Sequence, residues 1–331
     1  MRRVFSFMIV EIYDISKDIT IMVNQQTRIV APVLFNNVRI IGNSDSKIFI
    51  NDKEINSEQA TVNVGSANIL ITRENFYDFQ FTNEKNLGVV GHRGLGMDNG
   101  DVLENTIESF ELALKKVKWV EMDVQLAYKK TPVIFHDTLI YDEETKEHHT
   151  EKGEKVIMTN DFPPTLNQVL QALKGKGGIN LEIKYPINMD PLIQLSGFNE
   201  HDIESDADVG YDVPFFVDSI FKIIYKNNFT DIVFSSFSPY VLLYIKTRHP
   251  DARVLLLTDK YYEIINPFCT GIKLSGLVFN YRSFKTEDIS KLSECLDKYV
   301  YDVFTKEEYE NCVSMNIRGV ITDNIDELLS T

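Results

Sequence analysis

The sequence predicts an α/β protein with a TIM-type (β/α)8 barrel over residues 86–331 and a small all-β domain over residues 1–85. From Leu87 onward, apolar runs alternate with amphipathic stretches, which is how βα units appear in a sequence. The first 85 residues instead hold short runs rich in Ile, Val and Phe between turn residues. A length of 331 residues suits one barrel of about 250 residues and a small extra domain.

The predicted N-terminal domain consists of strands alone. Turn pairs such as Gly42-Asn43 and Asn51-Asp52 separate them. No residue of this domain belongs to a recognisable chemical constellation, so we interpret it as a packing or interaction module for an unidentified partner. The predicted strands are Val4–Tyr13, Ile19–Val23, Arg28–Val33, Val38–Ile41, Lys47–Ile50, Ala60–Val64 and Asn68–Thr72.

The strands predicted for the second domain number one more than a barrel needs. Only Tyr128–Thr131 separates the second from the third, which is too short for a crossover between parallel strands, so we predict a local hairpin there. An open doubly wound sheet is the alternative, but no GxGxxG or GxxxxGK[ST] motif marks a nucleotide site for it. The predicted strands are Gly88–Gly91, Trp119–Ala127, Pro132–His136, Gly178–Ile183, Asp231–Ser235, Arg253–Leu257, Gly276–Asn280, Tyr299–Phe304 and Gly319–Ile321.

Several helix starts can also be read from the sequence. Three segments have the spacing of a capping box, in which a side chain at the helix start and one three residues later each bond a backbone N–H. They are Asn105-x-x-Glu108, Thr165-x-x-Gln168 and Thr305-x-x-Glu308. Ser238-Pro239 places a cap residue before a proline at the first helical position, which is a further start signal.

Composition excludes some partners and favours one compartment. The chain has 34 basic and 49 acidic residues, a net charge of −15, so it lacks the clustered Lys and Arg that nucleic-acid binding requires. Its cysteines, Cys269, Cys295 and Cys312, show no CxxC spacing and favour a reducing compartment. No window reaches the roughly 18 apolar residues of a membrane span, so we expect a soluble, cytoplasmic protein.

Chemically capable side chains gather where the first four barrel strands end. The carboxyl ends of barrel strands form the active-site face, so we expect these side chains to converge. Residues two apart on a strand point to one face, which pairs Glu121 with Asp123 and Glu182 with Lys184. The complete set is His92, Arg93, Glu121, Asp123, His136, Asp137, Glu182 and Lys184.

This combination of side chains predicts a particular chemistry. Three carboxylates inside a barrel repel one another strongly unless a cation lies among them. Oxygen ligands completed by water suit Mg²⁺ or Ca²⁺, whereas the absence of Cys ligands disfavours a closed structural Zn²⁺ site. Two histidines beside an arginine and a lysine add acid and base groups next to an anion clamp. Together these groups predict metal-assisted cleavage of a phosphodiester.

Each of these residues also has a purely structural interpretation. A histidine at a strand end is often only hydrogen bonded, and Glu182 with Lys184 could form an ion pair of the barrel. The occurrence of suitable groups on four successive strand ends favours a site. By contrast, His148-His149 in a polar stretch and His249 before a proline are predicted to be surface residues.

The ordered motifs of the second domain resemble the glycerophosphodiester phosphodiesterase family. The resemblance covers residues 88–327 and is closest to the eukaryotic glycerophosphocholine phosphodiesterase branch, to which Gly94-Leu95-Gly96 is similar. It implies a TIM barrel. The segments are Gly91-His92-Arg93-Gly94, Glu104-Asn105-Thr106, Val120–Val124, Pro132–Asp137, Leu181–Lys184, Ser235-Ser236-Phe237 and Gly319–Asp323.

The resemblance implies hydrolysis of a small glycerophosphodiester, with glycerophosphocholine as the best candidate, to glycerol 3-phosphate and an alcohol. His92 and His136 would be the acid/base pair, and Glu121, Asp123 and Glu182 would bind the divalent metal, Mg²⁺ or Ca²⁺. Either water or the neighbouring glycerol hydroxyl could attack the phosphorus.

The resemblance further implies that Arg93 and Lys184 hold the phosphate and that Glu104 orients Arg93. Three departures from the family pattern are visible. Leu103 stands where the family has proline, which changes only a loop, and Phe304 replaces a tryptophan near the end of the barrel. Residues 1–85 are short for the carbohydrate-binding-like domain of the eukaryotic branch and match it poorly.

A cationic head group is one hypothesis for the substrate. Asp190–Asp218 contains many acidic residues and no Lys or Arg, so its field would attract a cation. Tyr185 and Phe304 could then contact a quaternary ammonium through their ring faces. The alternative is that this acidic segment is only a solvated loop.

Two other functions remain open at this stage. A lysophospholipase D-type enzyme would need an apolar groove at the barrel mouth, which Phe215, Phe216 and Phe221 could line, although they fit a helix core better. A catalytically inactive barrel could instead serve as a binding or regulatory protein. The retention of the whole set of acid, base and ligand residues argues against such a scaffold.

Overall fold

The computed structural model describes residues 79–96, 102–127, 130–142, 144–185, 213–259 and 263–330, together with eight strands between residues 4 and 77. The chain divides into two units, Met1–Phe79 and Gln80–Thr331. The ring of Phe81 already packs edge-on to that of Phe234, with 5.1 Å between ring centroids. The chain therefore enters the second unit a few residues before the domain start expected from the sequence.

The first unit contains two antiparallel four-stranded sheets, with strand orders β4–β1–β8–β7 and β3–β2–β5–β6. Every strand predicted here overlaps an observed one. The prediction missed Lys53–Ile55, because three residues are too few to show alternation. It also wrongly placed a turn at Gly42-Asn43, which instead continues a strand and pairs with Phe7 and Met8. The strands are β1 Val4–Tyr13, β2 Ile19–Val23, β3 Gln26–Val30, β4 Asn37–Asn43, β5 Ile48–Ile50, β6 Lys53–Ile55, β7 Gln59–Val64 and β8 Ala67–Tyr77.

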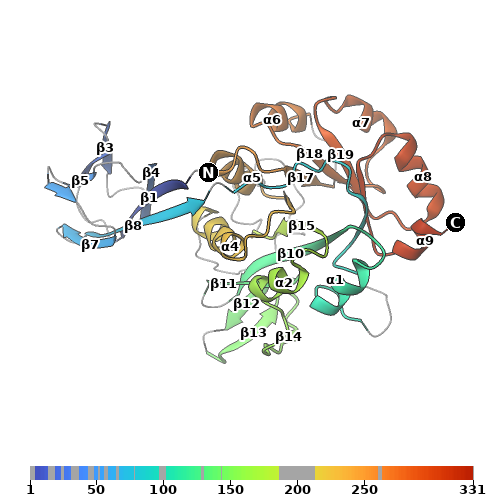
Figure 1. The fold of residues 1–331 in the computed structure, drawn as a ribbon, viewed down its shortest axis with the longest axis horizontal. Helices are drawn as coiled ribbons and strands as arrows, with labels where there is room; N and C mark the ends of the chain where they lie inside the picture. Colours follow the sequence, from blue (N-terminus) through green and yellow to red (C-terminus); the bar gives the residue numbers. More distant parts are fainter. Residues whose placement is uncertain are drawn as a thin grey trace. The chain divides into compact units, whose positions relative to one another are not determined.

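The second unit is a closed barrel of parallel strands in the order β9–β10–β15–β16–β17–β18–β19–β20, with β20 pairing back to β9 (Figure 1). This confirms the predicted TIM-type barrel. The surplus strand is also explained, because β11 pairs antiparallel with the end of β10 as the expected hairpin. The strands are β9 Gly88–Gly91, β10 Trp119–Ala127, β11 Thr131–Ile134, β15 Gly178–Ile183, β16 Ile232–Ser236, β17 Val254–Thr258, β18 Gly276–Asn280, β19 Asp297–Tyr301 and β20 Gly319–Thr322.

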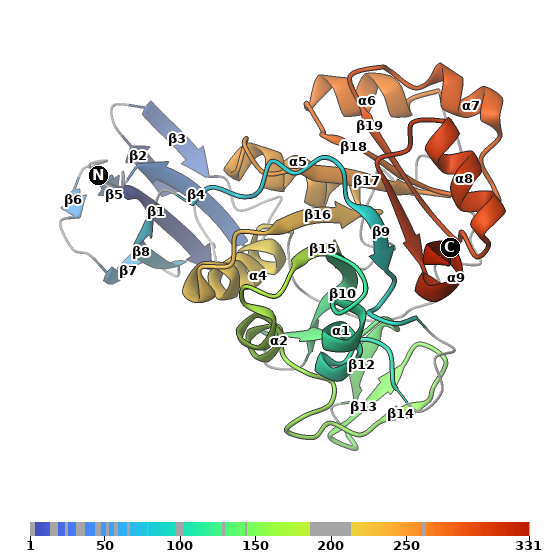
Figure 2. The ribbon, with the colours of Figure 1, turned by 45° about the vertical axis from the view of Figure 1, so that its right-hand side comes forward.

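Helices surround the strands of the barrel (Figure 2). The capping boxes at Thr165 and Thr305 form as predicted, and Ser238 caps the helix that begins with Pro239. Among the described residues, no helix is both long and apolar enough to cross a bilayer. The helices are α1 Ile107–Ala113, α2 Leu166–Leu173, α4 Val213–Asn227, α5 Pro239–Arg248, α6 Ile265–Gly271, α7 Thr286–Lys291, α8 Lys306–Ser314 and α9 Ile325–Leu329.

The interior of the barrel is an apolar core with polar residues above it. Strand alternation sends every second residue inward, so the residue two positions after a core residue faces the same interior space. On β9, for example, Val90 lies in this core and His92 follows at the strand end. The core residues are Leu87, Val90, Trp119, Val233, Leu255, Leu257, Val278, Tyr299 and Ile321.

An ion pair closes the amino-terminal end of the barrel. Nη2 of the buried Arg253 donates to Asp297 Oδ2 and to the Tyr299 hydroxyl, each at 2.8 Å. That hydroxyl donates in turn to the carbonyl of Lys85, at 2.7 Å, just before β9 begins. Because a buried guanidinium is costly without partners, this network stabilises the entry of the chain into the barrel.

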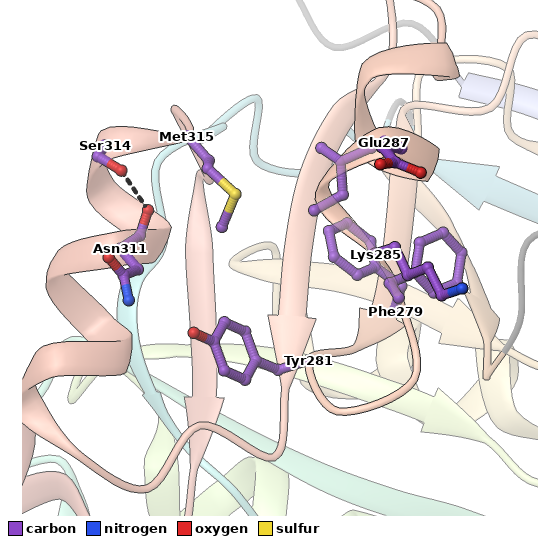
Figure 3. Close-up of a pocket in the computed structure, with 9 residues that line it drawn as sticks. Phe279, Tyr281, Lys285, Glu287, Asn311, Ser314 and Met315 are labelled. Atoms are coloured by element: carbon purple, nitrogen blue, oxygen red, sulfur yellow. Dashed lines mark hydrogen bonds between the residues drawn. The ribbon is translucent and has the colours of Figure 1, made fainter.

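A cavity of about 740 Å³ lies outside the strands, between β18, α7 and α8 (Figure 3). Phe279 and Tyr281 line one side, and Asn311 and Met315 of the α8 region line the other. None of its lining residues belongs to the set predicted from the strand ends. Helix α7, which contributes to this lining, has six residues.

The interpretation of His249 as a surface residue was wrong. Its ring stacks on that of Phe221, with centroids 4.5 Å apart, and its Nε2 lies 2.5 Å from the Tyr225 hydroxyl. Burial and the neighbouring Arg248 lower the pKa of His249 to about 3. Local spacing could not predict this contact, because the aromatic partners lie on the preceding helix, α4.

This packing predicts how barrel stability depends on pH. Below pH 6.5 His249 binds a proton in the unfolded chain but stays neutral in the folded barrel. The free energy of unfolding therefore falls as the pH falls toward 3. We expect the wild-type thermal midpoint to drop about 2–4 °C more than that of His249→Gln between pH 7 and pH 5. Calorimetry of both proteins measures this. Parallel losses in the two proteins would show that His249 titrates normally.

Candidate active site

Strand β10 contributes two carboxylates to the top of the barrel. Glu121 and Asp123 are only 3% and 1% exposed, and alternation points both inward. Glu121 Oε2 accepts a hydrogen bond from the backbone N–H of Arg93, at 3.0 Å. Glu121 and Asp123 therefore point to the same face of β10, as expected for residues two apart on a strand.

Strand β15 adds a carboxylate and an ammonium beside them. Glu182 lies opposite Asp123 in the register of β10 and β15. Lys184 Nζ lies 3.4 Å from Glu182 Oε1 and 3.8 Å from Asp123 Oδ1. The lysine therefore neutralises part of the negative charge while it remains at the open end of the strand.

The three carboxylates form a group that could hold a metal ion. One oxygen from each of Glu121, Asp123 and Glu182 lies within 4.8 Å of the others. Glu121 Oε1 is buried and has no hydrogen-bond partner. Burial and the charge of Asp123 raise the pKa of Glu121 to about 8. An orphaned oxygen and this repulsion among hard oxygen donors fit a divalent cation such as Mg²⁺ or Ca²⁺.

Arg93 reaches the same group from the turn after β9. Its φ of 49° and the φ of 96° at Gly94 belong to a tight turn, in which a Cβ on Gly94 would collide with Ser109. Arg93 Nη1 donates to Glu104 Oε1 at 2.9 Å, and its Nε lies 3.5 Å from Asp123 Oδ2. The predicted contact between Glu104 and Arg93 is thus present.

Asn105 is a site residue that the sequence interpretation assigned wrongly. Thr106, not Asn105, caps α1, with its hydroxyl accepting from the Ser109 N–H. Asn105 has a φ of 54° and turns inward, where its Nδ2 donates to Asp123 Oδ2 at 2.8 Å. Its Oδ1 accepts from the Asp123 N–H, at 3.3 Å. Asn105 therefore fixes the orientation of a carboxylate in the cluster.

His92 is held between two acidic groups. Its Nδ1 lies 2.7 Å from Asp323 Oδ1, and its Nε2 lies 4.0 Å from Glu121 Oε2. Although burial opposes the charged form, the bond to Asp323 and the charge of Glu121 together raise the pKa of His92 to about 9. Asp323 follows β20 and had been noted only as part of a motif. Its role could not be inferred because the two residues are 231 positions apart.

His136 follows the β10–β11 hairpin, and its surroundings favour the neutral imidazole, whereas those of His92 favour the charged one. Its Nδ1 lies 2.8 Å from Asp137 Oδ1. Gln125 Nε2 donates to the carbonyls of Phe135 and Asp137, which fixes this turn. Burial, followed by the charge of Lys184, lowers the pKa of His136 to about 4. The two imidazoles therefore favour different protonation states at neutral pH.

The structure gives Tyr185 and Phe304 neighbours of their own. Tyr185 is 7% exposed, and its ring packs edge-on to Phe216 at 5.3 Å between centroids. The guanidinium carbon of Arg282 lies 5.3 Å from the centroid of Phe304. Each ring predicted to contact a cationic head group is thus already in contact with a protein group.

Other residues singled out from the sequence lie away from the carboxylate cluster. Phe216 and Phe221 are buried in the core, which agrees with the preferred interpretation of a helix core. Lys130 Nζ lies 4.2 Å from the ring centroid of Phe215. His148 and His149 are half-buried in a small sheet rather than on the surface. This sheet consists of β12 Leu139–Asp142, β13 Glu147–Thr150 and β14 Lys155–Val156. Most of the acidic segment, residues 190–212, lies outside the described residues.

Comparison with protein families decides the class of this barrel. The model of the glycerophosphoryl diester phosphodiesterase family matches residues 92–327. The chain belongs to this family. The match spans every strand end described above, from His92 to Asp323, and therefore includes the carboxylate cluster and both histidines.

Curated relatives of this family member are identical to it at about a quarter of the aligned positions. The glycerophosphocholine phosphodiesterase GDE1 of Candida albicans is 27% identical over 249 residues, covering 52% of this chain and 21% of that protein. The glycerophosphodiester phosphodiesterase GDPD2 of Arabidopsis thaliana is 26% identical over 288 residues, covering 73% of this chain and 76% of its own. The chain thus spans about a fifth of the length of the fungal relative.

Solved structures of phosphodiesterases share the fold. An Oleispira antarctica phosphodiesterase in complex with the product sn-glycerol-3-phosphate superposes with a TM-score of 0.55 and 19% identity, covering 74% of this chain and 96% of that one. A glycerophosphodiester phosphodiesterase from Galdieria sulphuraria gives a TM-score of 0.54 and 18% identity, with coverage of 75% and 98%. These similarities support the barrel architecture of the family member.

Proposed function

We propose that this chain hydrolyses glycerophosphodiesters to glycerol 3-phosphate and an alcohol, with glycerophosphocholine as the best candidate substrate. The observation that carries the proposal is the convergence of three carboxylates, a lysine and an arginine with two oppositely tuned histidines. Two fungal relatives are glycerophosphocholine phosphodiesterases, which supports the choline head group.

The phosphate is proposed to bind between Arg93 and Lys184. Both cations border the carboxylate cluster, and Glu104 holds the guanidinium of Arg93 by a 2.9 Å hydrogen bond. A divalent ion held by Glu121, Asp123 and Glu182 would polarise a phosphoryl oxygen and offset its negative charge. The ion is proposed to be Mg²⁺ or Ca²⁺, because the donors are all carboxylate oxygens.

The two histidines are proposed to move the protons of the reaction. His92, held protonated by Asp323, donates a proton to the leaving alkoxide. His136, held neutral, accepts a proton from the attacking hydroxyl, which belongs to water or to the glycerol of the substrate. Attack by the glycerol hydroxyl gives a cyclic glycerol phosphate, which water then opens to glycerol 3-phosphate. In each case an aspartate bound to Nδ1 leaves Nε2 available for the transfer.

A substrate panel tests this function. Purified chain is incubated with glycerophosphocholine, glycerophosphoethanolamine and glycerophosphoinositol in Mg²⁺ or Ca²⁺, and glycerol 3-phosphate is measured. We expect metal-dependent release from glycerophosphocholine. If no glycerophosphodiester is cleaved, the alternative of a binding or regulatory barrel is favoured. Lysophosphatidylcholine is added to the panel to test the lysophospholipase D alternative.

Asp323 provides a separate test of how His92 works. Asp323→Asn leaves a hydrogen-bonding group in place but removes the charge that favours protonated His92. We expect kcat to fall about 10- to 100-fold with little change in KM, because substrate contacts are elsewhere. We also expect the loss to be smaller at lower pH, where His92 regains its proton. A pH-independent loss would contradict this assignment.

Further proposals concern the location and the first unit. The three cysteines show no disulfide, with Cys269 and Cys312 buried, which supports the proposal of a reducing, cytoplasmic setting. Residues 1–85 are proposed to serve as an interaction module, since the three carboxylates of the cluster all belong to the second unit.

A further inference from the structure

We propose that the carboxyl ends of β16–β19 hold a cationic substrate head group, with Asp259 and Tyr301 as its specificity determinants. The inference rests on the proposed function and adds to it the residues that would select an alcohol with a quaternary ammonium. The head group would bind in the half of the barrel mouth that lies opposite the carboxylate cluster.

The strand order places these residues across the mouth from the proposed phosphate site. Four positions around the closed barrel separate β17 from β9, and likewise β18 from β10. Tyr301 and Phe237 both pack on the interior core cluster, so both face the inside of the mouth. Side chains fill the interior of a barrel of this type, and ligands bind above them at the face formed by the carboxyl ends of the strands. A phosphodiester bound at Arg93 and Lys184 would therefore extend one end toward this half.

Negative charge gathers there around one aromatic ring. The Tyr301 hydroxyl donates to Asp259 Oδ1, and Asn280 Nδ2 donates to Asp302 Oδ2 at 2.6 Å. Burial, the bond to Asp259 and the charge of Asp302 all raise the pKa of Tyr301. Within the part of the chain that the structure describes, no lysine or arginine forms an ion pair with either aspartate. The nearest described cation, Arg282, is paired instead with Glu308 and lies over the ring of Phe304.

The hydrogen bonds here favour a cation over a polyol. The side-chain donors, the Tyr301 hydroxyl and the Asn280 amide, are already used on the two aspartates. Asn280 Oδ1 is also occupied, since it accepts from the N–H groups of Arg282 and Ser283. A hydroxyl-rich head group could donate to the aspartates, but neither of these two donors would be free to bond its oxygens. A quaternary ammonium requires no hydrogen bonds and is attracted by carboxylates and aromatic faces.

The buried hydroxyl of Ser235 is an independent sign that a ligand or a water molecule binds inside the barrel mouth. Ser235 Oγ is fully buried and has no hydrogen-bond partner. Ser235 lies between Glu182 and Leu255 in the strand register, and it follows the core residue Val233 by two positions. Its side chain therefore points inward beside Glu182, on the strand that lies between β15 and β17. An unpaired buried hydroxyl is costly unless something within the cavity satisfies it.

Steady-state kinetics on the purified full chain tests the proposal. For Asp259→Asn, we expect the ratio of kcat/KM for glycerophosphocholine to that for glycerophosphoinositol to fall about 3- to 30-fold. Tyr301→Leu should lower the ratio more than Tyr301→Phe, which keeps the ring. Glu307→Gln, which removes an exposed carboxylate of α8, is the matched control for net charge. Thermal midpoints show whether each variant is folded.

Two outcomes separate this inference from the proposed function. If the wild type cleaves both diesters and Asp259→Asn leaves the ratio unchanged, the head-group site is wrong and the function stands. Tetramethylammonium binding, measured by saturation-transfer NMR, covers the case in which no diester is cleaved. Binding that is lost in Asp259→Asn would then support the site without the function, and equal binding by both proteins would overturn it.

Discussion

Replacement of His136 by glutamine is expected to lower kcat about 10²- to 10⁴-fold while the barrel stays folded. The imidazole is tuned to remain neutral, with a pKa of about 4, by burial and by the charge of Lys184. Glutamine retains polarity and similar bulk but cannot accept a proton from the attacking hydroxyl. Rapid quench or coupled assays of glycerol 3-phosphate release measure the loss.

His148→Gln is the matched control for that experiment. His148 is half-buried on β13 and lies outside the carboxylate cluster, so its replacement is expected to leave kcat within about twofold. Circular dichroism and the thermal midpoint of both variants complete the comparison. If His136→Gln loses stability as sharply as activity, the histidine is structural and its proposed role fails.

Removal of the divalent ion is expected to abolish turnover. Chelation leaves Glu121, Asp123 and Glu182 facing one another with only Lys184 and Arg93 to offset them. We expect activity below one per cent with excess chelator and full recovery on adding Mg²⁺ or Ca²⁺.

The variant Glu182→Gln tests whether the required divalent ion binds at the carboxylate cluster. The amide removes one of three anionic donors, so the metal concentration for half-maximal activity should rise at least about tenfold. Glu108→Gln on the exposed side of α1 provides the control, with no expected change. An unchanged metal requirement in Glu182→Gln would mean that the ion binds elsewhere.

Local sequence patterns were sufficient to predict the barrel and most residues of the carboxylate cluster. The alternation on β10 identified Glu121 and Asp123 as neighbours, because a strand has only two faces. The same reasoning placed Glu182 beside Lys184 on β15. The short gap before β11 identified the hairpin that sets His136. In each case the information lies within a few residues.

Residues positioned by distant contacts could not be inferred in this way. Asn105 resembled a helix cap, yet its backbone adopts a positive φ and its amide binds Asp123. Asp259 and Tyr301 follow strands far apart in the chain, and only barrel closure brings their side chains together. Sequence spacing contains no record of such pairs, since they depend on the order of strands around the barrel.

The bond between His92 and Asp323 has a consequence for synthesis of the protein. By the time β19 has left the ribosome, the nascent chain already contains both imidazoles and all three carboxylates. It still lacks β20, the strand that pairs with β9, and with it the aspartate that orients His92. Under the proposed mechanism, the polypeptide therefore gains catalytic competence only after β20 and Asp323 have been synthesised.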